Sequence, residues 1–374
     1  MRRLRVGDWV EVRSKQEILA TLDSNGQLNG MPFMPEMFKF CGQRFRVYKR
    51  AHKTCDTVFP IRGRRLDATV HLETRCDGSG HGGCQAGCLL FWKEAWLRPL
   101  SSELHTLPGS SGTRNSGENA PNRRTQCTEL NVWSASSAPR ANDGVLIYTC
   151  QATQLPYATT SLAWWDIRQY VEDYTSGNVD LPQMFRGLVY SAYFNLSHAG
   201  IGVGRPMRWL YNLVCPLWGG SRWPRTTGTI PKGKPTPKET LNLQPGELVR
   251  VKAHEDIVGT LDTGGQNRGM SWDAEMVPYC GGRFTVLARV TKFINERTGE
   301  MQEMKNPGII LDSVVCQSRY SHCRMFCPRS IYSWWREVWL ERVVPSGFNT
   351  DGNTREIKQN ENTLWERDMA NREF

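Results

Sequence analysis

The chain has 374 residues, of which 39% are hydrophobic and 22% charged, and its formal net charge is +10. This length is enough for two or three domains with buried cores, and the composition excludes a wholly disordered chain. No apolar run approaches the roughly 18 residues of a membrane-spanning helix, and residues 1–5 lack the apolar stretch of a signal peptide. We therefore expect a cytoplasmic protein without a transmembrane segment.

The excess of basic residues favours an anionic partner. An acidic protein or another anionic macromolecule fits this charge, and nucleic acid is a further alternative. The arginines are scattered and form no dense basic block. Docking on a membrane surface is disfavoured, because the polar face of the helix predicted around Arg208 and Trp209 is not rich in lysine.

The first 100 residues form a repeat that returns at residues 245–345. Alternating apolar and polar residues predict strands at 6–13, 44–49 and 68–73, and similar runs occur at 245–252, 283–288 and 308–312. The two copies are offset by a constant 239 positions, which separates Asp23 from Asp262, Glu36 from Glu275, and Cys41 from Cys280. A duplication explains this constant offset.

The start of each repeat carries a resemblance to a known barrel. Residues 6–12 read VGDWVEV and residues 245–251 read PGELVRV. Both phrases resemble the first strand of SH3-like or KOW-type barrels. The resemblance implies a small β-barrel in each repeat, and the short strands separated by glycine turns favour the same architecture.

The region between the repeats differs in composition. Residues 101–126 are polar and rich in Ser, Gly, Asn and Pro, which predicts a flexible linker. Residues 127–218 are predicted to be mainly helical, with helices at 164–174, 180–196 and 206–214. Residues 219–244 are predicted to form an extended Pro/Lys-rich tether, and residues 346–374 a polar tail. The expected fold class is thus α+β, with two homologous SH3-like barrels separated by a mainly helical insert.

Each repeat contains a cluster of three cysteines and a fourth cysteine upstream. A chain with twelve cysteines in a reducing compartment favours metal-bound thiolates over disulfides. We therefore predict one four-cysteine site in each repeat, and the ligands are Cys41, Cys76, Cys84 and Cys88 in the first and Cys280, Cys316, Cys323 and Cys327 in the second.

The identity of the metal and the fourth ligand stay open. Zinc in two sites is the first expectation, but the same thiolates could hold [4Fe–4S] clusters. His81 or His322 could replace an upstream cysteine as the fourth ligand. The remaining cysteines could form a third site with His52, although separate buried thiols are favoured, and these are Cys55, Cys127, Cys150 and Cys215.

No catalytic motif occurs in the sequence, and we assign no catalytic residue. The recurring acids Asp23 with Glu36, and Asp262 with Glu275, could act as acid–base pairs, but turn capping is favoured. The tryptophans at 92, 96, 335 and 339 are expected to fill the barrels. The resulting hypothesis is a metal-binding tandem-repeat protein that serves as a binding or scaffolding module for an anionic partner. The alternatives are an iron–sulfur redox protein or accessory metalloenzyme, and a nucleic-acid-binding protein.

Overall fold

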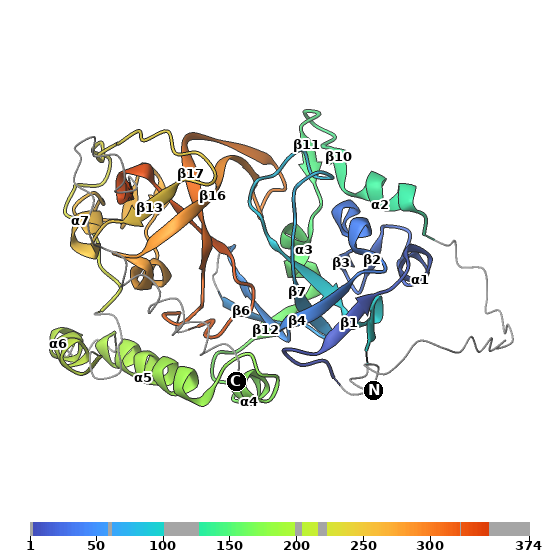
Figure 1. The fold of residues 1–374 in the computed structure, drawn as a ribbon, viewed down its shortest axis with the longest axis horizontal. Coiled ribbons are helices and arrows are strands. Elements are labelled where there is room, and N and C mark those ends of the chain that lie inside the picture. Colours follow the sequence, from blue (N-terminus) through green and yellow to red (C-terminus); the bar gives the residue numbers. More distant parts are fainter. Residues whose placement is uncertain are drawn as a thin grey trace, which may run out of the picture. The chain divides into compact units, whose positions relative to one another are not determined.

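Two five-stranded antiparallel sheets, one in each repeat, organise the fold (Figure 1). The structure is a computed structural model that describes residues 3–58, 62–100, 127–198, 204–215, 223–321 and 323–343. The described residues up to Arg342 belong to one compact unit. Strands and helices both contribute, which confirms the mixed α+β class. The predicted linker 101–126 and tail 346–374 lie outside the described residues.

The two sheets have the same strand order. In the first sheet the neighbours are β8 (Leu89–Lys93), β7 (Thr69–Arg75), β4 (Arg44–Arg50), β1 (Trp9–Val12) and β9 (Leu97–Pro99). In the second sheet they are β18 (Tyr332–Trp335), β17 (Met301–Val315), β16 (Arg283–Ile294), β13 (Leu248–Val251) and β19 (Leu340–Arg342). The register also matches across the offset, because Val10 pairs with Phe45 and Val249 pairs with Phe284.

Each repeat also contains short helices and strands between the strands of its sheet. In the first repeat these are α1 (Lys15–Leu19), β2 (Gln27–Leu28), β3 (Met31–Pro32), η1 (Pro35–Phe40) and η2 (Glu94–Trp96). In the second they are α7 (His254–Val258), β14 (Gln266–Asn267), β15 (Met270–Ser271), η4 (Ala274–Tyr279) and η5 (Glu337–Trp339). Ser14 caps α1 by accepting a hydrogen bond from the Glu17 amide.

The core of each sheet is built around paired tryptophans. The side chains of Trp92, Trp96, Trp335 and Trp339 are fully buried, which confirms that they fill the interior. The indole of Trp96 donates to the Thr21 hydroxyl at 3.1 Å, and that of Trp339 donates to the Thr260 hydroxyl at 2.9 Å. These two large apolar rings therefore also have partners for their N–H groups.

The middle region contains the predicted helices and additional elements. The helices predicted at 164–174, 180–196 and 206–214 are found as α4 (Arg168–Thr175), α5 (Leu181–Ser197) and α6 (Gly204–Val214). Asp180 caps α5, since its carboxylate accepts from the Gln183 amide at 2.7 Å. Among the described helices, none is both long and apolar enough to cross a membrane.

The prediction missed the other elements of the middle region. These are α2 (Glu129–Ala135), β10 (Ser137–Pro139), β11 (Leu146–Tyr148), α3 (Gln151–Ala158) and β12 (Thr160–Leu162). They are short and lack a clear period, and β12 exists because it pairs with β6 (Arg62–Arg65) of the first repeat, which in turn pairs with β5 (Lys53–Asp56). Tertiary pairing, rather than local sequence, decides these segments.

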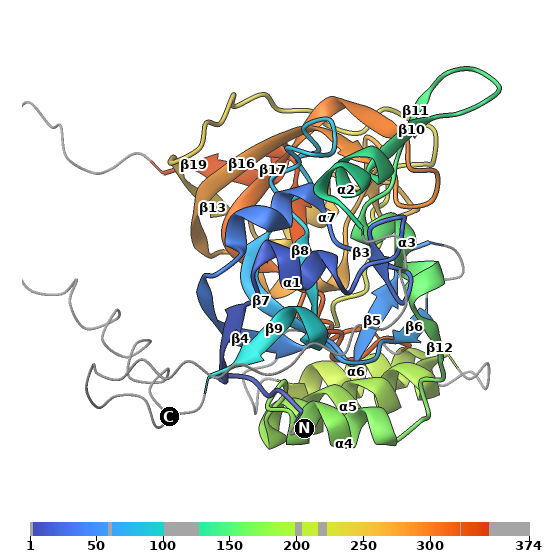
Figure 2. The same cartoon turned by 90° about the vertical axis from the view of Figure 1, so that its right-hand side faces the viewer.

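Helices α4, α5 and α6 lie along one edge of the molecule in both views (Figures 1 and 2). Helix α4 is attached to the first repeat, because Asp173 accepts from the Lys53 ammonium at 2.6 Å and both side chains are buried. Helix α5 is attached to the second repeat, because the backbone of Gly187 lies directly against the Phe326 ring.

Candidate metal centres

The cysteine-rich loop of the first repeat connects β7 to β8. The Cys76 amide donates to the Cys88 carbonyl at 2.9 Å and closes the loop at its base. Within it the Cys84 amide donates to the His81 carbonyl at 3.1 Å. Gly78 must be glycine, because its φ is +73° and an added Cβ would meet the Cys84 carbonyl oxygen. The backbone of this loop is thus tightly folded next to its thiols, and this conformation requires glycine at position 78.

Four cysteines line one small cavity inside this loop. Its volume is about 30 Å³, and the cysteines are Cys76, Cys84, Cys88 and Cys150. Cys150 comes from the middle region, where it immediately precedes α3 and is held in place by hydrogen bonds between Cys150 and Thr153. No spacing in the sequence links Cys150 to the loop cysteines, so sequence reasoning missed it.

Cys41 does not line this cavity. It lies at the end of η1 and packs against the edge of the first core. Burial raises the pKa of its thiol, and the charges of Lys15 and Glu129 act on this pKa in opposite directions. Cys280 has the matching position at the end of η4, where burial raises the pKa of its thiol to about 12 and the nearby Glu255 adds to this shift. The structure therefore brings together the three loop cysteines of the first repeat, but not the upstream cysteine.

The thiols of the cavity are strongly desolvated. Burial raises the pKa of Cys88 to about 12 and that of Cys150 to about 11, and it raises the pKa of Cys76 further, with the nearby Glu36 adding to the shift. At neutral pH these groups are therefore protonated unless a cation replaces their protons. A bound divalent ion is one species that could do so.

Glu36 and His81 form a buried pair beside the same loop. Glu36 Oε1 accepts hydrogen bonds from His81 Nδ1 at 2.7 Å and from the Gly80 amide at 3.0 Å. Burial alone would raise the pKa of Glu36, but the hydrogen bond and charge of His81 lower it below its usual value. His81 Nε2 lies 3.1 Å from the Thr149 carbonyl, so both ring nitrogens of His81 are occupied. His322, the other histidine considered as a ligand, lies outside the described residues.

The recurring acids do not share one role. Asp23 accepts from the amides of Asn25 and Gln27, and Asp262 accepts from those of Gly264 and Gln266, as expected for turn capping. Glu275, the counterpart of Glu36, accepts from the Tyr320 amide at 2.5 Å, and burial raises its pKa. We therefore assign no acid–base pair to these residues.

The cysteine-rich loop of the second repeat receives a cysteine from the first. The Cys316 amide donates to the Ile331 carbonyl at 2.8 Å and closes this loop. The thiol of Cys55, on β5, is hydrogen-bonded to the thiol of Cys327. The Cys323 carbonyl lies against Gly63, which pairs with Cys55 across β5 and β6. The β5–β6 hairpin of the first repeat is therefore inserted at the cysteine loop of the second.

The surroundings of Cys55 and Cys327 shift the pKa values of these two thiols in opposite directions. The hydrogen bond from Cys327 and the charges of Arg329 and Arg324 together lower the pKa of Cys55 to about 6, against the opposing effect of burial. Burial raises the pKa of Cys327 well above its usual value, and so does the neighbouring Cys55. Cys55 is thus more readily ionised than Cys327.

The relationship between the two repeats is reciprocal. Ile294 occupies the position of Cys55 in the second repeat, 239 residues later. Its amide lies 3.4 Å from the Cys84 sulfur, and the Lys292 ammonium donates to the Gly82 carbonyl at 2.8 Å. Thr57 and Glu296, which are also 239 positions apart, hydrogen-bond to each other. Each repeat therefore extends a hairpin onto the cysteine loop of the other.

Arg329 is buried beside the cavity of the first loop. It is 3% exposed and lines that cavity. Its Nη2 donates to Glu296 at 2.6 Å, whereas its Nη1 has no hydrogen-bond partner among the residues that the structure describes. Because a buried, incompletely paired guanidinium is costly, the arrangement favours further negative charge in the cavity.

No three histidine, cysteine, aspartate or glutamate side chains within the described residues are arranged so that they could hold a metal ion. The four cysteines line the cavity without forming a coordination shell, so binding of an ion would require their sulfur atoms to move closer together. Of the other cysteines considered for a third site, Cys127 lies beside Thr128 and Cys215 lies in the aromatic cluster around Tyr190. Because Cys150 lies at the first cysteine loop and Cys55 at the second, these four cysteines do not come together in a third site.

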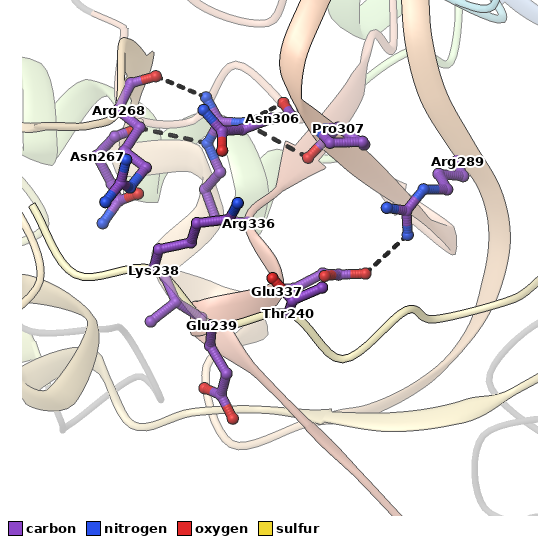
Figure 3. Close-up of a pocket in the computed structure, with 11 residues that line it drawn as sticks. Lys238, Glu239, Thr240, Asn267, Arg268, Arg289, Asn306, Pro307, Arg336 and Glu337 are labelled. Atoms are coloured by element: carbon purple, nitrogen blue, oxygen red, sulfur yellow. Dashed lines mark hydrogen bonds and ion pairs between the residues drawn. The ribbon is translucent and has the colours of Figure 1, made fainter.

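A second concave region lies in the second repeat and is basic (Figure 3). Its volume is about 100 Å³. The guanidinium of Arg336 points at the carbonyls of Arg268, Asn306 and neighbouring residues and donates to them. Arg289 pairs with Glu337 at 2.8 Å, and Arg336 is likewise supplied with acceptors. The guanidinium groups of Arg289 and Arg336 thus already have acceptors within the second repeat, and we assign no ligand to this region.

Comparisons with known proteins gave no match to a family model, to a curated protein or to a solved structure. The proposals that follow are therefore built on the residues of this chain.

Proposed function

We propose that the protein is a metal-binding scaffold of two SH3-like repeats with two thiolate sites, one of which joins the repeats, and that it binds an anionic partner in the cytoplasm. The observation that carries this proposal is the gathering of thiols from distant parts of the chain. Cys150 of the middle region joins the first loop, and Cys55 of the first repeat joins the second loop. The proposed ligand sets are Cys76, Cys84, Cys88 and Cys150, and Cys55, Cys316, Cys323 and Cys327.

The second site would connect the repeats. Its four thiolates would come from β5 of the first repeat and from the loop of the second, so the ion would act as a cross-link. Structural zinc contributes on the order of 10 kcal/mol in small domains, which is enough to fix two modules in one orientation. The proposed scaffolding role follows from this fixed orientation.

The size and charge of the first cavity favour a single ion. A volume of about 30 Å³ exceeds the roughly 10–15 Å³ required by one water, whereas a cube of four irons and four sulfides would need the thiols to move apart. Zinc bound by four thiolates carries a net negative charge, which the incompletely paired Arg329 would offset. We therefore propose zinc before [4Fe–4S].

Metal analysis of single-cysteine variants tests the proposal. The protein is purified without oxygen, and zinc and iron are measured per chain. We expect two zinc ions in the wild type and one each in Cys150→Ser and Cys55→Ser. The matched controls Cys41→Ser and Cys280→Ser should keep two, because their thiols lie outside the proposed sets.

Each other outcome has a defined meaning. A folded wild type without zinc or iron would overturn the proposed function. Loss of metal in Cys41→Ser, with full loading in Cys150→Ser, would restore the ligand set expected from sequence alone. A brown protein that absorbs near 400 nm would replace zinc by iron–sulfur clusters.

A further inference from the structure

The helical edge formed by α4, α5 and α6 has one face that packs against the repeats. On α5, Tyr190 contacts Tyr320 with ring centroids 5.0 Å apart, and Gly187 lies against Phe326. On α4, buried Asp173 binds Lys53. These contacts define the inner face, and they fix which side of each helix is left to solvent.

The outer face of α5 is apolar. Its exposed side chains include Leu181, Phe185, Leu188, Ala192 and Leu196, which follow one another at intervals of four, three, four and four residues. This spacing places them in one stripe along the helix. Phe185 is 64% exposed, so a large aromatic ring of this stripe has no cover within the described chain.

The neighbouring helices continue this exposed apolar surface. On α6, Trp209 is 68% exposed and Leu213, one turn later, is also exposed. Ile167, Val171 and Tyr174 form a similar exposed row at α4. Helix α5 contacts both α4 and α6, and all three lie along the same edge (Figure 2). The apolar side chains therefore cover a broad layer of helices, not a single site.

From the first residue of α5 through the end of α6 the only charged residues are basic, although Asp180 caps the start of α5. Residues 181–238 contain no aspartate or glutamate and eight lysines or arginines, although the whole chain has 37 acidic residues. Arg186, Arg205 and Arg208 are exposed beside the apolar stripes. None of the ion pairs between described residues involves these three arginines. The layer thus combines uncovered apolar groups with cations that have no acidic partner in the described part of the chain.

We infer that this layer docks on an anionic lipid membrane surface. Exposed Trp, Phe and Leu beside arginines are the composition of helices that lie in the membrane interface, where apolar side chains enter the lipid and arginines bind the headgroups. A second copy of this chain fits poorly, because it would place the same unpaired arginines against each other. The inference deepens the proposed binding of an anionic partner and rests on it, but it is independent of metal binding.

Arginine, rather than lysine, supplies the positive charge of α5 and α6. Arg186 is exposed on α5, and Arg205 and Arg208 are exposed on α6. Each basic residue near a membrane surface contributes roughly a fivefold gain in binding. Loss of all three arginines should therefore weaken binding on the order of 100-fold.

Vesicle binding by the full-length protein tests the inference. Co-sedimentation is measured with phosphatidylcholine vesicles that contain or lack phosphatidylserine. We expect binding to the anionic vesicles only, with loss in Phe185→Ser/Trp209→Ser and in Arg186→Gln/Arg205→Gln/Arg208→Gln. The matched control is Leu130→Ser on α2, an exposed apolar residue outside the layer, which should bind like the wild type.

Other outcomes would overturn the inference. These are no binding to anionic vesicles, equal binding to both kinds of vesicle, or equal loss in Leu130→Ser. Binding to a poly-glutamate peptide but not to vesicles would assign the layer to an acidic protein instead. Zinc measured on the same samples separates the two proposals, since two ions per chain without vesicle binding would leave the metal sites intact.

Discussion

A buried histidine should make the stability of the first repeat dependent on pH. His71 lies in β7 with no exposed surface. Its Nδ1 donates to the Leu90 carbonyl at 2.8 Å, which leaves Nε2 without a hydrogen-bond partner among the described residues. Burial lowers the pKa of His71 to about 3, and the charges of Lys49, Arg329 and Arg75 contribute to this shift. The imidazole is therefore neutral in the folded protein across the physiological range.

The sign and size of the effect follow from proton linkage. An unfolded histidine has a pKa of about 6.5, so between about pH 6.5 and pH 3 the unfolded chain binds more protons than the folded chain. The contribution of the neutral His71 ring to the free energy of unfolding is therefore fully present above about pH 6.5 and is lost as the pH falls towards 3. The slope approaches about 1.4 kcal/mol per pH unit, and the total loss by pH 3 is on the order of 5 kcal/mol.

The second repeat suggests the variant that tests this effect. Ile310 occupies the matching position 239 residues later and is also buried. The substitution His71→Ile should therefore fit the sheet and remove this source of acid sensitivity. Urea unfolding at pH 7 and pH 5 should show that the wild type loses about 2 kcal/mol more than the variant.

An equal loss of stability in the wild type and His71→Ile between pH 7 and pH 5 would refute the reasoning. A nuclear magnetic resonance titration provides a second readout. The His71 ring should keep the chemical shifts of a neutral imidazole at pH 5, and protonation of the folded state at that pH would contradict the assigned cause.

Three further predictions concern stability and assembly. Asp173→Ala should cost about 3–5 kcal/mol, measured by urea unfolding, because it leaves the buried Lys53 ammonium without its carboxylate; Asp173→Asn should cost less. Trp339→Ala should cost about 3–5 kcal/mol, because it removes a fully buried ring and the indole bond to Thr260, and a loss below about 1 kcal/mol would contradict the assigned packing. If metal joins the repeats, a zinc chelator should speed proteolysis of the β5–β6 hairpin in the wild type; unchanged cleavage would argue against the cross-link.

The sequence indicated the elements that have a strong local period or cap. Helix α5 was predicted within one residue at each end, because Asp180 is an N-cap and the apolar pattern that follows has helical spacing. The strands β4 and β7 were predicted in the same way from alternation. The segment 160–162 has no such pattern. It forms a strand because it pairs with β6, which lies about 100 residues away in the sequence.

The candidate metal centres show the same division. Spacing alone grouped Cys76, Cys84 and Cys88, since residues this close in a glycine-rich loop must remain near one another. The upstream Cys41 was the expected fourth member because it recurs as Cys280 at the constant offset. The structure instead places Cys150 with the first loop. A repeated position predicts an equivalent place in the two sheets, whereas proximity to the cysteine loop depends on how distant segments of the chain pack together.

The sequence by itself determined the two related sheets, the buried tryptophans, the two cysteine loops and the three helices of the middle region, because each depends on residues that are near in the chain or repeated at one offset. Only the tertiary structure decided that Cys55 meets Cys327 and that each repeat extends a hairpin onto the loop of the other. Such contacts depend on the packing of whole elements, and no local spacing in the chain encodes them.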